Sequence, residues 1–385
     1  MKSKRITSRH SLSTDQHTLP LLFVIFILAV IESSCAGRPL AIGFVGPLTG
    51  PSSAVGLGAR NGFQMAFGDG PGAAGGKLGS IKLLIKDDAN DQDQCLRAFR
   101  ELKADGCRLV ILATTSQAAQ KAIPWAIGEG ILVISPTVSD PTFSGTDDLF
   151  FRVNESSGSY GEMLARTVLE RFGIRTVGLI GDLRNRTYTS AVFDAFSDTY
   201  EKLGGNTAFK LEFDSAKSVE PDKMTAEIKR TGTRAIVVVA ASSETVIIAK
   251  TLEKERLNAR LFLPPWPLTV DLLKNGGNAV EGVVAVSVSD MEYRTEAGKA
   301  FRDNYLKEYG EGPSYTAMFG WEGAAILRTA ISESPRADPL SIKKQILSTG
   351  VFQGPQGTIE FNKAGDASRS KFLFEIRGGQ FVRIE

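Results

Sequence analysis

Short apolar runs alternate with segments of helical spacing along most of this chain. The run at 109–112 is apolar at every position, which favours a strand covered on both faces, and the residues after it repeat apolar side chains at helical intervals. This alternation is typical of a parallel sheet with helices on both sides. The strands expected before residue 154 are 40–45, 81–86, 109–112, 131–135 and 150–153. The helices expected among them are 54–67, 91–104 and 116–127.

A second alternation of the same kind begins after residue 154, and its expected strands are 176–180, 206–213, 235–239, 260–263, 281–288, 358–361, 372–376 and 380–384. Polar stretches at 154–158 and 289–291, and a glycine-proline turn at 354–357, interrupt the pattern at places where the chain could cross between lobes. We therefore expect an α/β fold with two interleaved lobes, each with a parallel sheet. Lobe 1 would comprise 38–154 and 290–351, and lobe 2 would comprise 155–289 and 352–385.

Hydroxyl side chains follow two of the expected strands. Thr115 and Ser116 come after strand 109–112, and Ser139 comes after strand 131–135. Ligands of open parallel sheets bind beyond the carboxyl ends of the strands, and a helix that starts there offers unpaired N–H groups. These positions therefore suit a carboxylate or another small anion. The same residues also fit ordinary helix N-caps, and the local pattern leaves both interpretations open.

The first 36 residues have the parts of a secretory signal peptide. Basic residues precede the apolar run 21–31, and small residues follow it. The run is too short to span a bilayer, so we expect an exported, periplasmic protein that begins at Gly37. Cys35 offers an alternative, in which it becomes the lipidated first residue of a membrane-anchored protein. Glu32 argues against this alternative, because an aliphatic residue is expected there in a lipoprotein signal.

Composition excludes several kinds of partner and cofactor. Removal of residues 1–36 takes away four basic and two acidic residues, which leaves 41 of each from the original 45 and 43. A neutral chain gives no support for binding nucleic acid or a membrane surface. Both histidines lie in the removed segment, so a histidine-ligated metal is excluded, and we expect no cofactor. Cys95 lies near the start of the expected helix 91–104, and Cys107 lies just past its end. About ten helical residues span ~15 Å between them, which is too far for a disulfide, so we expect two free thiols.

Four motifs resemble the type I periplasmic binding proteins of the leucine/isoleucine/valine-binding family. They are IGFVGPLTG at 42–50, DDAN at 87–90, EGILVISP at 129–136 and GPQGTIEFNKAGD at 354–366. The resemblance covers nearly all of residues 38–385. It implies two Rossmann-like lobes joined by three crossings, which close over a small solute and deliver it to the membrane permease of an ABC importer. It also implies a monomer.

The same resemblance assigns roles to single residues. Ser116 falls where the family binds the ligand carboxylate, with Thr115 beside it, and Ser139 falls at a second hydroxyl contact. Val138 falls at a backbone contact, and Tyr188 lies near an aromatic residue of the pocket. Three positions depart from the family. Trp266 lies in the loop where the family uses a glutamate to bind the ligand ammonium, and Ser242 and Val55 stand where the family has aromatic residues.

The departure at Trp266 bears on the ligand, because a buried ammonium without a counter-charge is costly. Either Asp182, Glu244 or Asp290 replaces the missing acid, or the ligand has no amine. Trp266 could pack on an aliphatic or aromatic body, cover a cation by a cation–π contact, or pack outside the pocket. We expect a solute that carries a carboxylate, either an amino acid or a related organic acid.

Two other functions compete with solute binding. The fold also serves as the ligand domain of receptors, which would need a separate signalling partner here. An exported α/β enzyme is the other alternative, but the chain has no Gly-x-Ser-x-Gly elbow, P-loop or Cys-x-x-Cys motif. Gly56, Gly58 and Gly62 resemble a dinucleotide fingerprint, yet they lie inside an expected helix, so we expect them to allow close helix–sheet packing. We therefore predict a binding protein and not an enzyme.

Overall fold

A computed structural model of the chain describes residues 39–68 and 81–384. The expected signal peptide, 1–36, and Cys35 lie outside the described residues. Within them, no helix is both long and apolar enough to cross a membrane.

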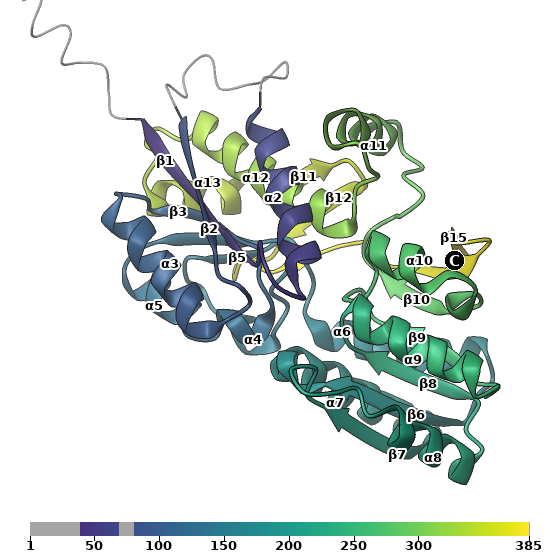
Figure 1. Cartoon of the computed structure of the whole chain (residues 1–385). Helices are drawn as coiled ribbons and strands as arrows, with labels where there is room; N and C mark the ends of the chain where they lie inside the picture. The colour runs from purple at the N-terminus through teal and green to yellow at the C-terminus, as the bar shows by residue number, and fades with distance from the viewer. Residues whose placement is uncertain (1–38, 69–80, 385) are drawn as a thin grey trace, which may run out of the picture. The chain divides into compact units, whose positions relative to one another are not determined.

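The first sheet is parallel throughout and has the strand order β2-β1-β3-β4-β5 (Figure 1). Its strands are β1 (Leu40–Gly46), β2 (Ile81–Asp87), β3 (Leu109–Leu112), β4 (Leu132–Ser135) and β5 (Phe150–Arg152). The helices between them are α2 (Ser53–Phe67), α3 (Gln92–Ala104), α4 (Ser116–Ala119) and α5 (Ala122–Gly128), with a 3-10 turn at Pro141–Phe143. Leu109 and Ile111 pack in one apolar cluster, while Val110 and Leu112 pack in another. The expected strand at 109–112 is therefore confirmed as buried on both faces.

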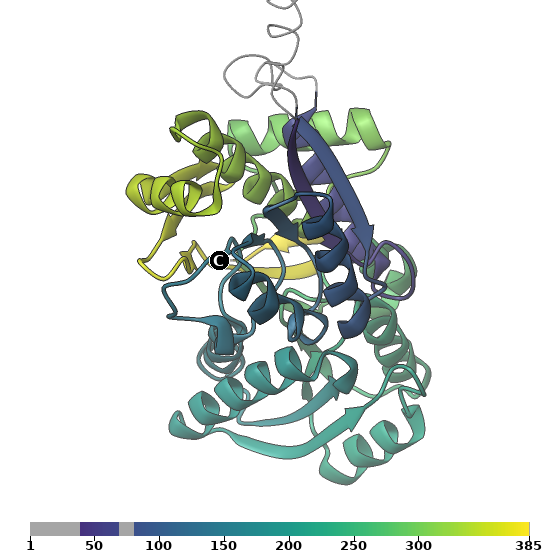
Figure 2. The same ribbon diagram turned by 90° about the vertical axis from the view of Figure 1, so that its left-hand side faces the viewer.

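The second sheet has the order β15-β14-β10-β9-β8-β6-β7 and is parallel except for the last two strands in sequence, β14 and β15 (Figure 1). Figure 2 shows the teal part of this sheet in a view turned by 90°. Its strands are β6 (Thr176–Asp182), β7 (Asn206–Phe213), β8 (Ala235–Val239), β9 (Arg260–Leu263), β10 (Val284–Ser287), β14 (Phe372–Arg377) and β15 (Gln380–Arg383). The connecting helices are α6 (Ser157–Arg166), a π-helical turn (Thr167–Arg171), α7 (Arg186–Lys202), α8 (Pro221–Thr231), α9 (Ser242–Lys254) and α10 (Val270–Gly276), with 3-10 turns at Leu183–Asn185 and Gly277–Val280. The predicted α/β class with parallel sheets is confirmed.

Three helices follow the second sheet's parallel strands in sequence: α11 (Glu296–Tyr309), α12 (Tyr315–Glu333) and α13 (Pro339–Thr349). Helix α12 packs closely on α2 (Figure 1), and glycines make this approach possible. A Cβ atom on Gly62 would lie 1.9 Å from the Ala317 carbonyl oxygen, and one on Gly320 would lie 2.2 Å from the Ala59 carbonyl oxygen. The expectation of close helix–sheet packing for the α2 glycines is therefore wrong. Gly58 and Gly62 lie against α12, and Gly56 lies against Pro47 in the turn after β1.

The chain after α13 divides between the two cores. A small antiparallel sheet of β11 (Val351–Gly354), β12 (Gly357–Phe361) and β13 (Ala367–Ser368) comes first. Phe352 and Phe361 pack in the same cluster as Phe44 of the first sheet, whereas β14 and β15 extend the second sheet. The segment 352–385 was expected to belong wholly to lobe 2. In the structure its first part, through β12, packs in the core of the first sheet.

One expected helix is interrupted. The pattern predicts a single helix at 116–127, but α4 ends at Ala119 and α5 begins at Ala122. Pro124 has no N–H to bond to the carbonyl of Gln120, so a continuous helix would lose a hydrogen bond at this point. Cys95 and Cys107 are buried and unpaired, as expected.

Candidate functional site

The carboxyl end of β3 leads directly into a helix cap. The Thr115 hydroxyl accepts a hydrogen bond from the Ala118 N–H at 3.3 Å and donates one to the side-chain oxygen of Asn90. This is the geometry of an N-cap, which satisfies a backbone donor that the helix itself leaves free. The Thr115 hydroxyl proton is therefore used within the protein, even though Thr115 lines the cavity described below.

Ser116 links the ends of β3 and β4. Its Oγ accepts a hydrogen bond from the backbone N–H of Ser139 at 3.2 Å, and the residue is buried. The hydroxyl proton of Ser116 has no acceptor among the described residues, so it can still donate to a ligand. The sequence reasoning left a ligand contact and a helix N-cap open for Ser116, and the structure gives the N-cap position to Thr115. The structure adds a bond within the protein.

The two other expected contacts on β4's loop lie off the cavity. The Val138 N–H donates to Ser135 Oγ at 3.0 Å, and the Val138 side chain packs in the apolar core. The Ser139 carbonyl accepts two hydrogen bonds from Ser157, at 2.7 Å from N–H and 2.9 Å from Oγ. The Ser139 hydroxyl is buried without a hydrogen-bond partner. Neither residue is among those that line the cavity, although the Ser139 hydroxyl keeps its bonding capacity.

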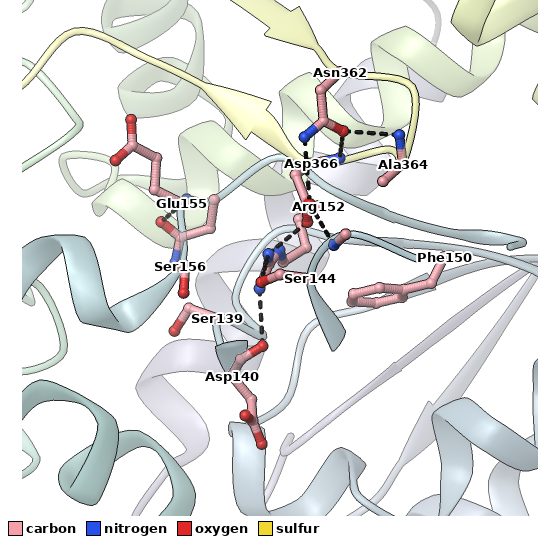
Figure 3. A network of polar contacts seen from close by, with 12 residues as sticks. Ser139, Asp140, Ser144, Phe150, Arg152, Glu155, Ser156, Asn362, Ala364 and Asp366 are labelled. Carbon is pink, nitrogen blue, oxygen red and sulfur yellow. Dashed lines mark hydrogen bonds and ion pairs between the residues drawn. The ribbon is translucent and has the colours of Figure 1, made fainter. Parts of the chain in front are cut away.

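A buried arginine holds this loop in place (Figure 3). Arg152, at the end of β5, donates from Nη1 to the Asp140 carbonyl at 2.9 Å and from Nη2 to Ser144 Oγ and to the Asp366 carboxylate. Asp366 also accepts the Gly145 N–H at 2.9 Å. The loop after Ser139 is thereby tied to the segment between β12 and β13. Sequence reasoning missed Arg152, because an arginine at the end of an apolar strand run carries no sign of the carbonyl, hydroxyl and carboxylate groups that its side chain will meet.

A cavity of about 20 Å³ lies where residues from both large sheets meet. Its lining comprises Val55, Thr114, Thr115, Ser116, Thr137, Asn154, Asn185, Tyr188, Pro265, Trp266 and Tyr315. This volume is room for about one water molecule. An amino acid or an aromatic acid can enter only if the lining moves apart. Four of the seven residues expected at the site line this cavity, namely Ser116, Thr115, Tyr188 and Trp266.

The aromatic side of the cavity is buried and carries unpaired polar atoms. The rings of Tyr188 and Trp266 are 5.7 Å apart between centroids and inclined at 74°, in an edge-to-face arrangement. The Tyr188 hydroxyl and the Trp266 indole nitrogen are both buried without a hydrogen-bond partner. Burial raises the pKa of Tyr188 well above its usual range, so its hydroxyl keeps its proton.

Asn185 joins the two sides of the cavity. Its Oδ1 accepts the backbone N–H of Gln117, in α4, at 3.1 Å, although Asn185 itself follows β6 of the second sheet. Only the oxygen of the amide can accept from an N–H, so this bond fixes the orientation of the side chain. Because Asn185 accepts from the Gln117 N–H, the first turn of α4 does not offer this donor to a ligand.

The cavity contains no charged side chain in its lining. Asp182 accepts the N–H groups of Arg184 and Ser215, which fixes its carboxylate at a turn. Asp290 accepts the N–H groups of Glu292 and Arg294 in the same way. Glu244, the third acid considered as a replacement for the missing glutamate, accepts from Ser243 and does not line the cavity. Nothing in this lining neutralises an ammonium.

Ser242, the last of the expected site residues, lies away from the cavity. Its hydroxyl shares a hydrogen bond of 2.8 Å with the Thr269 hydroxyl. Several lining residues were missed by the sequence reasoning: Thr114, Thr137, Asn154, Asn185, Pro265 and Tyr315. Thr114 and Thr137 could have been found, because they too are hydroxyl residues at strand ends. Tyr315 could not, because only the tertiary fold brings the start of α12 to this place. In the described part of the chain, no group of three or more His, Cys, Asp or Glu side chains could hold a metal ion.

Comparison with known proteins agrees with this architecture. The sequence matches the family model described as periplasmic binding protein over residues 39–380. It is 23% identical over 356 residues to the leucine-, isoleucine-, valine-, threonine- and alanine-binding protein of Pseudomonas aeruginosa, covering 92% of this chain and 94% of that protein. The leucine-binding protein LivK of Thermotoga maritima has a similar fold, with a TM-score of 0.83, 20% identity, and coverage of 90% of this chain and 98% of that one. A solute-binding protein of an ABC transporter from R. palustris, solved in complex with benzoate, has a TM-score of 0.81, 18% identity, and coverage of 90% and 95%.

These relatives and structural neighbours are substrate-binding proteins and not enzymes. The family binds small molecules outside the cytoplasm and works with ABC-transporter permeases. The family match spans both large sheets and the cavity where their residues meet. This chain therefore belongs to the periplasmic binding protein family.

Proposed function

We propose that this protein binds a small carboxylate with an apolar or aromatic body and delivers it to the permease of an ABC importer. The observation that carries the proposal is the cavity lining, in which hydroxyl groups, amides and aromatic rings occur without any charged side chain. Ser116 can donate to a carboxylate, and Tyr188 and Trp266 provide apolar surface for the body of the ligand.

The amine is the feature that separates this proposal from amino-acid binding. An ammonium in this lining would be buried without a counter-charge, which costs several kcal/mol. The benzoate complex of the R. palustris protein supports an acid without an amine, since that ligand has none. An α-amino group is therefore tolerated at most. Leucine and similar amino acids are the second candidate, because the Pseudomonas aeruginosa relative and the Thermotoga maritima neighbour are named for them.

Binding requires the two sides of the cavity to separate and close again. In this proposal, lobe 1 contains the first sheet with α11 to α13 and the small sheet, and lobe 2 contains the second sheet with β14 and β15. The bond between Asn185 and Gln117 would join the lobes in the closed state. We also propose that the mature protein is a monomer in the periplasm, beginning at Gly37. The intact mass of the exported protein tests this start, because lipidation at Cys35 would give a heavier product.

Calorimetric titration of the mature protein tests the ligand class. We expect benzoate or 4-methylpentanoate to bind and to raise the melting temperature by mass action, with leucine weaker than the acid that lacks its amine. Tight leucine binding with none for the acid that lacks the amine would refute the proposal and show that an ammonium site exists.

A matched pair of variants tests the site. Ser116→Ala should weaken binding by about ten- to hundred-fold, because a hydrogen bond to a charged group typically contributes ~1.5–3 kcal/mol. Ser242→Ala is the control, since this hydroxyl lies off the cavity, and it should leave affinity unchanged. Equal affinity in the two variants would exclude Ser116 as a carboxylate contact.

A further inference from the structure

The second-sheet side of the cavity offers hydrogen-bond donors that the protein leaves unused. Trp266 Nε1 and the Tyr188 hydroxyl are buried and unpaired, and both side chains line the cavity. Only 7% of Trp266 and 5% of Tyr188 is exposed, so bulk water does not satisfy these groups. Buried polar groups in folded proteins are nearly always paired, and an exception calls for a partner that the protein chain does not supply.

The chemistry of these atoms restricts the partner. An indole N–H donates and cannot accept, so it pairs with an acceptor. The Asn185 amide adds a third donor, because its oxygen already accepts from Gln117 and its Nδ2 has no partner among the described residues. An ammonium, which only donates, would leave the indole N–H unpaired. A second carboxylate would bring a negative charge to a lining that holds no cation.

We propose that the solute carries an oxo group in addition to its carboxylate, and that Trp266 and Tyr188 bind this oxygen. A carbonyl oxygen has two lone pairs and no charge, so it can accept from the indole N–H and from the tyrosine hydroxyl together. The carboxylate would lie toward Ser116, on the first-sheet side. This inference rests on the proposed function and narrows its ligand class to an oxo acid with an apolar or aromatic body.

Matched ligands separate the oxo group from the rest of the solute. Titration calorimetry would compare 4-methyl-2-oxopentanoate with 4-methylpentanoate, and phenylpyruvate with 3-phenylpropanoate. Each pair differs only in the oxo oxygen. We expect the wild-type protein to bind the oxo member of at least one pair about ten-fold or more tightly, as the loss of one hydrogen bond in a buried site implies.

Two variants locate the contact. Tyr188→Phe removes only the hydroxyl, whereas Trp266→Phe removes the indole N–H together with part of the ring. Each should bring the ratio of the affinities for the oxo acid and the matching plain acid close to one, whatever its effect on the plain acid itself. Melting temperatures near the wild-type value would show that both variants fold. If a variant weakens both members of a pair equally, its ring serves packing and the inference is wrong.

The remaining outcomes are distinct. Equal binding of both members of each pair by the wild-type protein would overturn the oxo-group inference and leave the proposed function standing. Tighter binding of leucine than of its oxo acid would also overturn the inference, because the ammonium would then be recognised. Absence of binding for all these acids would refute the proposed function itself, and the inference with it.

Discussion

A buried ion pair between α12 and the segment that leads to β14 should contribute strongly to stability. Arg369 donates to Glu322 through both terminal nitrogens, at 2.6 and 3.0 Å, and the two side chains are 3% and 0% exposed. The guanidinium also lies 4.5 Å from the ring centre of Phe319. Glu322→Gln would keep the shape of the side chain and leave the arginine charge buried without its counter-charge. Breaking a buried pair in this way costs about 3–5 kcal/mol, a large share of the roughly 5–15 kcal/mol that stabilises a typical domain.

Urea unfolding followed by circular dichroism measures this loss as a shift of the midpoint at constant slope. The control is Arg166→Gln, which breaks the pair with Glu170 on the surface of α6, where the side chains are 59% and 53% exposed. That variant should lose less than about 0.5 kcal/mol. The double variant Glu322→Met with Arg369→Met should lose less than the sum of the two single changes, because neither charge is left alone. A loss below about 1 kcal/mol for Glu322→Gln would refute the reasoning, since it would mean that water reaches the arginine.

Three further predictions follow from the same structure. Thr115→Ala should lower the free energy of unfolding by about 1 kcal/mol in urea titrations, because the N-cap bond to Ala118 disappears; an unchanged midpoint would contradict this. Gly62→Ala should lower the melting temperature despite the better helix propensity of alanine, because its Cβ would meet the Ala317 carbonyl. Gly128→Ala in α5 is the control and should not lower it, because a Cβ there meets nothing within 4 Å. Burial raises the pKa of Asp88 to about 6 from 3.8, so the folded state keeps this proton between the two values, and the contribution of Asp88 to stability should fall as the pH rises through this window. Asp88→Asn should reduce that slope in urea titrations at a series of pH values, and an unaltered slope would exclude Asp88 as its source.

The periodicity of the chain was enough to predict the class of fold and most of its elements. Strand 109–112 is apolar at every position because helices cover both of its faces, and that burial is recorded directly in residue type. The same local logic placed hydroxyl residues at the end of β3, where Thr115 and Ser116 line the cavity, and at the end of β4, where the expected Ser139 does not. Such features depend on neighbours in sequence, so they can be read without the structure.

Long-range packing decided the rest. Ser242 and Val138 were expected to contact the ligand. In the structure Ser242 forms a hydrogen bond with Thr269, and the Val138 side chain lies in the apolar core. Asn185 and Tyr315 reach the cavity only because the chain crosses between the two sheets, and no local pattern encodes such crossings.

The sequence by itself therefore determined the alternating elements, the unpaired cysteines and the absence of histidine after residue 17, because each depends on composition or local spacing. Only the tertiary structure decided which polar groups meet at the cavity and which of them remain unpaired. Trp266 Nε1 and the Tyr188 hydroxyl became candidate donors because the residues that surround them, distant in sequence, exclude water and supply no acceptor.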